Sequence, residues 1–325
     1  MNAHTRIADH ERGYFTEADS VDVVVGRNVE AKDERLKQVM EVVTRHLHEA
    51  VKEIEPSQDE WMAAIRFLTR TGQLCDDWRQ EWILLSDTLG VSMLVDAINS
   101  RRPTGASENT VLGPFHVADS PELKMGTDIC LDGKGERMFV HGRILDTDGA
   151  PLEGVKIDVW QANDEGFYDV QQKGIQPDFN LRGVFRTGAD GRYFFRAVKP
   201  KFYPIPADGT VGELLDALGR HPFRPAHFHY IVTRDGYDPL TTHIFDPDDP
   251  YIHSDAVFGV KASLMAKFEP VHDPARAKEL GFPDELEGRF YDVEHDFVLA
   301  RHGETGGDPS QAATTLAEPG APRAG

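Results

Sequence analysis

The chain has 325 residues, 40% of them hydrophobic, and a formal net charge of -20, with 35 Lys and Arg against 55 Asp and Glu. Such a chain can bury a substantial core, but its charge and its lack of a basic stripe exclude nucleic acid and anionic membrane surfaces as expected partners. No apolar run is long enough to span a bilayer or to form the core of a signal peptide, and Cys75 and Cys130 are isolated from one another. We therefore expect a cytoplasmic protein without a disulfide framework or a thiolate zinc site.

Helical periodicity distinguishes the first third of the chain. Residues 1–32 are polar and lack a repeating pattern, which predicts an arm. From residue 33 to about 55, apolar residues recur every three or four positions and predict an amphipathic helix. Ser57 and Glu60 have capping-box spacing and predict the start of a second helix. A third helix is expected at about 77–99; its apolar surface is so wide that we expect it to contact both a partner subunit and the following domain.

The composition changes at Pro103 and Gly105, beyond which short segments are rich in β-branched and aromatic residues. Asp-Gly turn signals at 148–149 and 190–191 predict two hairpins. Because no helical segment separates the expected strands, we predict an antiparallel β-sandwich, and an α+β chain as a whole. The expected strands are residues 138–145, 155–160, 183–187, 193–198, 226–233 and 240–245. We divide the chain into an N-terminal arm (1–32), a helical domain (33–106), a β-sandwich domain (107–302) and a disordered tail rich in Gly, Pro, Ala, Ser and Thr (303–325).

Two histidines two residues apart indicate a metal site. His227 and His229 fall in an expected strand, where side chains alternate between faces, so both imidazoles should point the same way. The alternative is a pair of hydrogen-bonded histidines without a metal. No H-E-x-x-H helix or cysteine cluster supports a common zinc site. A ferrous site with two histidines and one carboxylate would need a placed acid, for which Asp235 is the available candidate.

Two tyrosines are better partners for these histidines. Tyr168 and Tyr203 follow expected strands at their exits, where loops often carry site residues, although a single tyrosine there is more often structural. Phenolates are hard anions, and two of them offset most of the charge of a ferric ion. Coordination would also drive proton loss far below the usual tyrosine pKa of about 10. If both tyrosines converge on His227 and His229, the four residues make a ferric site.

Several of these segments resemble the intradiol ring-cleavage dioxygenases. The resemblance extends from about residue 15 to 295, because the helical third is similar to the linker and dimerisation domain of the catechol branch of that family. Three further segments are most similar to the members of this branch that cleave hydroxyquinol; catechol-cleaving members usually carry Gln where His243 stands. The family segments are residues 140–168, 203–206 and 224–229, and the hydroxyquinol segments are residues 110–115, 241–245 and 254–261.

The resemblance implies a non-haem Fe(III) enzyme with one Fe(3+) per subunit. It would cleave hydroxyquinol (1,2,4-trihydroxybenzene) with O2, incorporate both oxygen atoms, and form 3-hydroxy-cis,cis-muconate and then maleylacetate in aromatic catabolism. Arg224 would stabilise negative charge on the bound substrate, Tyr203 would leave the metal and accept a proton, and His243 would hydrogen-bond a ligand or the substrate. The implied iron ligands are Tyr168, Tyr203, His227 and His229.

The resemblance also implies a substrate pocket and partners. Asp87 would accept a hydrogen bond from the third hydroxyl of hydroxyquinol, although an acid there can also pair locally on its helix. The helical domain would form a homodimer, with a tunnel that can hold a phospholipid. Catechol or chlorocatechol is the alternative substrate, and a non-enzymatic transthyretin-like module is the alternative class. The expected pocket residues are Leu84, Asp87, Val111, Leu112, Gly113, Pro114, Phe115, Ile205, Pro206, Arg224 and Val257.

Overall fold

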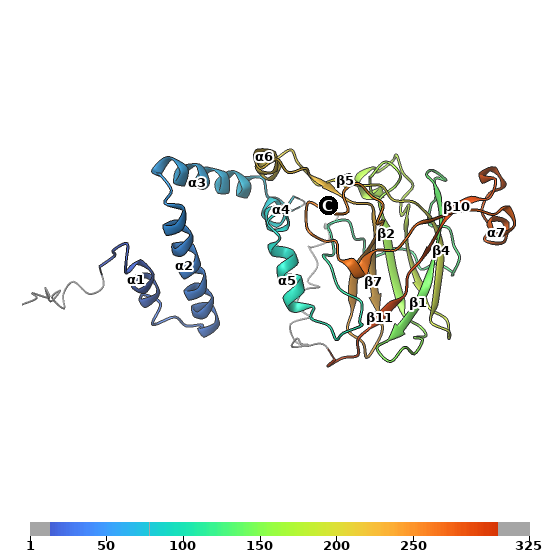
Figure 1. The fold of residues 1–325 in the computed structure, drawn as a ribbon, viewed down its shortest axis with the longest axis horizontal. Helices are drawn as coiled ribbons and strands as arrows, with labels where there is room; N and C mark the ends of the chain where they lie inside the picture. The colour runs from blue at the N-terminus through green and yellow to red at the C-terminus, as the bar shows by residue number, and fades with distance from the viewer. Residues whose placement is uncertain (1–13, 78, 305–325) are drawn as a thin grey trace, which may run out of the picture. The chain divides into compact units, whose positions relative to one another are not determined.

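The computed structural model describes residues 14–77 and 79–304; most of the expected tail, from residue 305, lies outside the described residues. The described residues fall into two compact units, which divide between Arg70 and Thr71. Figure 1 shows helices in the first unit, and further helices with a β-sandwich in the second.

Of the three helices predicted in the first third of the chain, the first two form as single helices. α2 (Glu34–Ile54) starts where the Asp33 carboxylate accepts a hydrogen bond from the backbone of the first turn, and the predicted capping box of Ser57 and Glu60 precedes α3 (Gln58–Gln73). The arm prediction missed a short helix, α1 (Ser20–Gly26).

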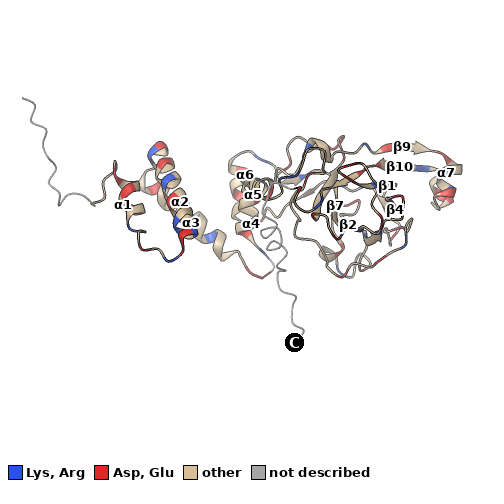
Figure 2. Ribbon diagram, turned by 90° about the horizontal axis from the view of Figure 1, so that it is seen from below, with Lys and Arg blue, Asp and Glu red and all other residues tan. Residues whose placement is uncertain are grey.

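The surface of α2 carries charged residues and a separate apolar stripe. Figure 2 shows both signs of charge along α2, and within the described residues no helix is long and apolar enough to cross a membrane. The apolar stripe of α2 remains exposed in the single chain: Leu47 is 60% exposed and Ile54 is 71% exposed.

The predicted third helix is wrong as a single element. It consists of α4 (Glu81–Thr88) and α5 (Val91–Asn99), separated by Leu89 and Gly90. Gly90 has a φ of +74°, a conformation that glycine tolerates and that a continuous right-handed helix excludes. Both short helices are rich in apolar residues, so the sequence pattern did not reveal the break between them.

Two main sheets form the sandwich (Figure 1). One contains β1 with β4 antiparallel on one side and β10 and β11 parallel on the other, and β9 pairs with β10. The other is antiparallel throughout, in the order β3-β2-β7-β8. The first sheet comprises β1 (Arg137–Asp146), β4 (Arg192–Val198), β9 (Glu269–His272), β10 (Arg289–Glu294) and β11 (Phe297–Leu299); the second comprises β2 (Lys156–Gln161), β3 (Arg182–Arg186), β7 (His227–Thr233) and β8 (Leu240–Phe245).

Smaller elements complete the second unit. β5 and β6 form a two-stranded ribbon, and α6 lies between them in the chain, a helix that the sequence pattern did not predict. Within the described residues these elements are β5 (Tyr203–Pro204), β6 (Phe223–Arg224), α6 (Thr210–Ala217), α7 (Pro274–Glu279) and the 3-10 helices η2 (Asp169–Gln171), η3 (Ala262–Leu264) and η4 (Asp284–Leu286).

Both predicted hairpins are wrong, although both turns form. The Gly149 N–H donates to the Asp146 carbonyl and the Gly191 N–H donates to the Gly188 carbonyl, so the chain reverses at each Asp-Gly signal. However, β1 and β2 belong to different sheets, as do β3 and β4. Each turn therefore carries the chain from one layer of the sandwich to the other.

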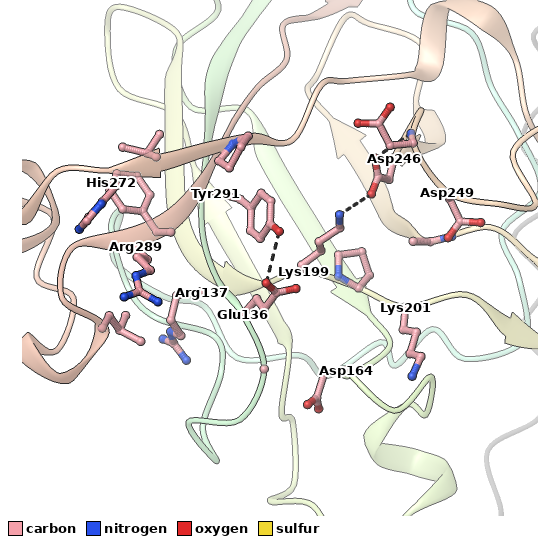
Figure 3. Close-up of a pocket in the computed structure, with 18 of the residues that line it drawn as sticks. Glu136, Arg137, Asp164, Lys199, Lys201, Asp246, Asp249, His272, Arg289 and Tyr291 are labelled. Atoms are coloured by element: carbon pink, nitrogen blue, oxygen red, sulfur yellow. Dashed lines mark hydrogen bonds and ion pairs between the residues drawn. The ribbon is translucent and has the colours of Figure 1, made fainter.

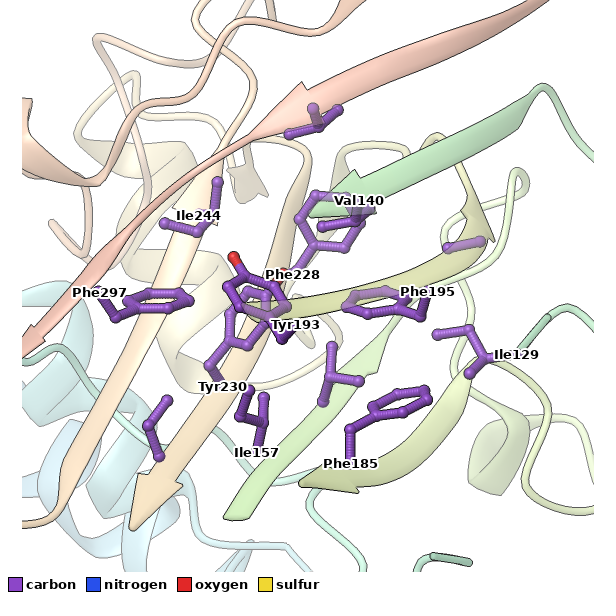
Figure 4. Close-up of a cluster of buried hydrophobic side chains, with 14 of the residues drawn as sticks. Ile129, Val140, Ile157, Phe185, Tyr193, Phe195, Phe228, Tyr230, Ile244 and Phe297 are labelled. Atoms are coloured by element: carbon purple, nitrogen blue, oxygen red, sulfur yellow. The ribbon is translucent and has the colours of Figure 1, made fainter. Parts of the chain in front are cut away.

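Strand alternation separates the core from the site. Phe228 and Tyr230 of β7 pack between the sheets with Phe195 and Phe297 (Figure 4). The residues that alternate with them along β7, His227 and His229, therefore face the opposite side of the sheet. The same strand thus supplies the hydrophobic core with one set of side chains and the candidate site with the other.

Candidate metal centre and substrate pocket

The centre is built on the sheet face opposite the core. Trp160, His229 and His243 are cross-strand neighbours on β2, β7 and β8. The Trp160 ring stacks on His229 at 4.7 Å between centroids and 10° between planes, and His243 meets His229 edge-on at 4.1 Å. His227 pairs with Phe245 in the next facing row. This ring packing sets the orientation of His229 within the sheet.

Loops bring two phenols onto this face. Tyr168 ends the segment after β2, and Tyr203 begins β5. The Tyr168 oxygen lies 2.8 Å from His229 Nε2 and 3.3 Å from the Tyr203 oxygen. The Tyr203 oxygen is 3.4 Å from His227 Nε2, which is 3.2 Å from His229 Nε2. The four atoms form a closed ring, as expected for ligands at about 2.0–2.1 Å from one ion.

The protonation chemistry of these residues fits a metal cation. All four are buried, and burial raises the pKa of the Tyr168 phenol well above its usual value. Burial, followed by the charge of Arg224, lowers the pKa of His227 to about 3, and burial also holds the pKa of His229 well below its usual value. The imidazoles are therefore neutral and able to ligate. A multivalent cation would offset the burial cost of the phenolates.

His243 is a further buried nitrogen donor at the centre. Neither of its ring nitrogens has a hydrogen bond of good geometry among the described residues, although the nearby Val111 backbone acts to raise its pKa against the effect of burial. Its ligand atom lies within 4.8 Å of those of His227 and His229. Burial keeps the pKa of His243 well below its usual range, so the ring is neutral. A neutral imidazole with free nitrogens can hydrogen-bond a bound molecule or water.

An apolar loop of residues 110–115, here called the lip, closes over the histidines. At Gly113 a side-chain carbon would lie 2.9 Å from His229 Cε1, and the φ of Gly113 is +76°. Both features require glycine. The Phe115 ring stacks on Tyr168 with centroids 4.5 Å apart. The structure therefore brings Gly113 and Phe115 directly onto the proposed ligands.

The other residues expected in the pocket belong to a buried cluster or lie nearer the surface. Leu84 of α4 packs against a buried cluster that includes Ile205 and Val257. Asp87 is on the same helix and is partly buried; burial raises its pKa, while the Ser92 hydroxyl and the charge of Arg224 act in the opposite direction. The remaining expected pocket residues are the partly buried Val111 and the exposed Leu112, Pro114 and Pro206.

Arg224 is fixed beside His227 by a carboxylate. Its Nε lies 3.2 Å from Asp255 Oδ1, and its Nη1 lies 3.3 Å from His227 Nε2. The same carboxylate accepts the Val257 and Gly259 N–H groups. Arg224 lowers the pKa of Asp255 despite its burial, so the pair is ionised.

Asp255 was not recognised as a partner from the sequence. It lies 31 residues from Arg224 and was noted only as part of a family segment. A buried arginine does predict that some carboxylate must pair with it, but no local signal indicates which one. Asp235, the acid considered for a ferrous site, is exposed beyond the end of β7, which removes that alternative.

A separate hollow of about 980 Å³ is not a candidate for the same chemistry (Figure 3). Lys199 ion-pairs with Asp246 at 2.9 Å, and Tyr291 donates to Glu136 at 3.3 Å. Lys199 and Tyr291 thus already have partners in the wall of this hollow. None of the four converging tyrosines and histidines lines it.

Comparison with known proteins assigns the chain to a family. A dioxygenase domain family matches residues 112–300, and the family of catechol dioxygenase N-terminal domains matches residues 33–107. The chain belongs to the intradiol ring-cleavage dioxygenases. This confirms the predicted enzyme class and the sandwich with helices before it, and it excludes the non-enzymatic module.

Among its relatives, hydroxyquinol 1,2-dioxygenases are prominent. The chain is 71% identical over 289 residues to the hydroxyquinol 1,2-dioxygenase of a Rhizobium species, covering 89% of this chain and 97% of the relative. The crystal structure of hydroxyquinol 1,2-dioxygenase from Pseudomonas putida has 46% identity and a TM-score of 0.82, covering 88% of this chain and 99% of that one. Catechol 1,2-dioxygenase of Acinetobacter radioresistens is more distant, with 29% identity and a TM-score of 0.75 over 91% of this chain and 97% of that one.

Proposed function

We propose that this enzyme cleaves hydroxyquinol with O2 between its adjacent hydroxylated carbons. The product is 3-hydroxy-cis,cis-muconate, which tautomerises to maleylacetate. The observation that carries the proposal is the closed ring of two phenol oxygens and two imidazole nitrogens, 2.8–3.4 Å between neighbours, in a chain 71% identical to a hydroxyquinol 1,2-dioxygenase.

In this proposal one ferric ion per subunit is held by Tyr168, Tyr203, His227 and His229. Two hard phenolates suit a trivalent cation, and neutral imidazoles complete a donor set that iron accepts. When bound, the iron would supply Lewis-acid chemistry that favours loss of the substrate's hydroxyl protons and makes the ring reactive toward O2.

The chain's own residues handle protons and charge. The Tyr203 phenolate accepts a proton from one substrate hydroxyl. Arg224, fixed by Asp255, provides a permanent positive charge where negative charge develops on the ring. His243 offers a neutral nitrogen to a ligand or to the substrate. The lip and the wall formed by Leu84, Ile205 and Val257 exclude water from the ring.

The proposed function is tested with purified, metal-analysed protein. We expect one iron per chain, a visible phenolate-to-iron charge-transfer band, and O2 uptake that is faster with hydroxyquinol than with catechol. Protein that remains colourless after ferrous loading and air oxidation would contradict the ligand set. Equal efficiency with both substrates, or a preference for catechol or chlorocatechol, would contradict the substrate assignment alone.

Asp87 should determine the preference for the third hydroxyl. We expect the Asp87→Ala variant to lose about 10- to 100-fold in kcat/KM for hydroxyquinol, because the substrate hydroxyl then has no acceptor in a desolvated pocket. Turnover of catechol, which lacks that hydroxyl, should change little. Steady-state O2 uptake with both substrates measures the ratio of kcat/KM for hydroxyquinol to kcat/KM for catechol.

A matched control for this variant is Asp96→Asn. Asp96 is also an acid whose pKa is raised by burial, but it lies on α5 near Lys261 and is not assigned to the pocket. It should leave the substrate ratio unchanged. A parallel loss with both substrates in Asp87→Ala would show that the residue acts on folding or catalysis and not on selectivity.

We further propose that the helical segment forms a homodimer and that a phospholipid binds between apolar helix faces. We also propose that the enzyme is cytoplasmic, where its unpaired cysteines would stay reduced. The support is exposed apolar surface, including Leu47 and Ile54 of α2 and Leu94 of α5. We expect Leu47→Glu to shift the sedimentation coefficient from dimer to monomer, whereas Lys52→Ala on the same helix should not. Wild-type protein that sediments as a monomer contradicts the dimer, and a lipid-free extract contradicts the bound phospholipid.

A further inference from the structure

A buried arginine outside the proposed ligand set connects two parts of the centre. Arg182 begins β3 and is 1% exposed. Its Nε donates to Asp169 Oδ1 at 2.6 Å, and its Nη1 donates to the Phe115 carbonyl at 2.6 Å. A guanidinium is rarely buried without such partners. Arg182 therefore joins the residue that follows Tyr168 to the last residue of the lip.

The lip and the segment that carries Tyr168 and Asp169 also meet through two rings. The Phe115 ring stacks on the Tyr168 ring at 4.5 Å and 27°. The Tyr168 oxygen, in turn, lies 2.8 Å from His229 Nε2. The lip thus contacts the proposed ligand with a side chain on one side and, through Arg182 and Asp169, with its backbone on the other. Such a double connection fixes the position of the lip relative to the phenol.

Backbone strain accompanies this connection. Phe179 and Leu181, just before Arg182, have φ values of +61° and +60°, which side-chain-bearing residues rarely adopt. The Phe179 N–H donates to Asp169 Oδ2, the oxygen that Arg182 Nε does not use. Strained residues of this kind persist where the surrounding contacts hold them. The strained residues Phe179 and Leu181 thus lie in the segment that supplies both hydrogen-bond donors to Asp169.

We propose that Arg182 is a positioning residue that locks the lip to Tyr168, so that the pocket wall and a metal-binding phenol keep one fixed geometry. The proposal rests on the assignment of Tyr168 as a ligand. A fork with separate donors is needed because the carboxylate and the carbonyl belong to segments far apart in sequence, and a lysine ammonium cannot reproduce both directions. Arg182 contacts neither the substrate nor the metal in this role.

The test compares Arg182→Lys and Arg182→Gln with Arg186→Gln. Arg186 is on the same strand, is exposed and pairs with Glu122, so it controls for the loss of an arginine from β3. We expect Arg182→Lys, assayed per bound iron, to raise KM for hydroxyquinol about 10-fold with a smaller change in kcat, because the lip moves relative to the substrate. Loss of a residue that orients a metal ligand typically costs 10- to 100-fold in metal affinity or activity. Arg182→Gln should also shift the phenolate charge-transfer band. Arg186→Gln should have the wild-type KM and the wild-type position of the charge-transfer band.

A double-variant cycle tests whether Arg182 acts through the lip. Phe115→Leu removes the ring stacking but keeps the carbonyl, and its effect on KM should be smaller in the Arg182→Lys background than alone. Should Arg182→Lys fail to fold, Asp169→Asn, which keeps the guanidinium and its bond to Phe115, should show the same rise in KM.

The outcomes separate the two proposals. A wild-type KM and an unshifted band in folded Arg182 variants, or additive effects in the cycle, would overturn the locking role. A wild-type protein without the band would overturn the Tyr168 assignment itself.

Discussion

We expect the Tyr168→Phe variant to lose the visible charge-transfer band attributable to that phenolate and more than about 100-fold in turnover. Loss of a group that merely supports a ligand costs 10- to 100-fold, so loss of a ligand should cost more. The substitution removes one oxygen and keeps the ring that stacks on Phe115. It also removes one of two anions that offset the charge of the cation, so iron affinity should fall. Metal analysis, absorption spectra and O2 uptake measure the three effects.

The control is Tyr291→Phe, which removes a phenol oxygen at the hollow of Figure 3, away from the proposed ligands. It should retain iron, colour and activity. A Tyr168→Phe protein with the wild-type spectrum and turnover would mean that the 2.8 Å approach to His229 is an ordinary hydrogen bond. The ferric ligand set would then have to be rebuilt around His243, the other buried donor at the centre.

The second large effect concerns Arg224. We expect Arg224→Gln to lower kcat by about 100- to 1,000-fold, the usual consequence of removing a preorganised group that faces developing charge. The same change should destabilise the protein by about 3–5 kcal/mol, because Asp255 becomes a buried carboxylate without its cation. Turnover under saturating substrate and urea unfolding measure the two consequences separately.

A second substitution separates catalysis from stability. In Arg224→Gln/Asp255→Asn both charges of the buried pair are removed, so most of the lost free energy of unfolding should return while kcat remains low. Recovery of kcat in the double variant would contradict a direct role for the guanidinium. It would indicate that the single variant failed through an unpaired Asp255 and a disturbed turn at residues 255–259.

The local sequence pattern predicted where strands form better than it predicted which strands pair. All six expected strands form, and β7 shows why: its alternating residues, such as Phe228 and His229, have a period of two that is visible without a structure. The pairing prediction failed at the two Asp-Gly turns because a turn specifies only a reversal. Which strand the chain then joins depends on segments distant in sequence, as β1 does with β10 and β11.

In the candidate site, too, local features were predicted from the sequence and contacts between distant residues were not. His227 and His229 share a face because they are two residues apart on a strand. Tyr168 and Tyr203 were proposed as partners from their places at strand exits, and the family resemblance then implied that they are ligands. Asp255 and the Arg182 lock were missed. Their contacts join residues 31 and 67 positions apart, and a single acid or arginine in a loop or strand carries no sign of its partner.

Residue types and spacing were enough to predict the donor types, the strand that carries two of them, the likeness to a family and the apolar stripe of α2. The folded chain was needed to show that two phenols and two imidazoles meet within 2.8–3.4 Å, that burial keeps the imidazoles neutral, and that Gly113 lies against His229. This is because ligation, desolvation and charge pairing depend on distances across the sheet. Residue spacing determines those distances within one strand, and packing determines them between strands and loops.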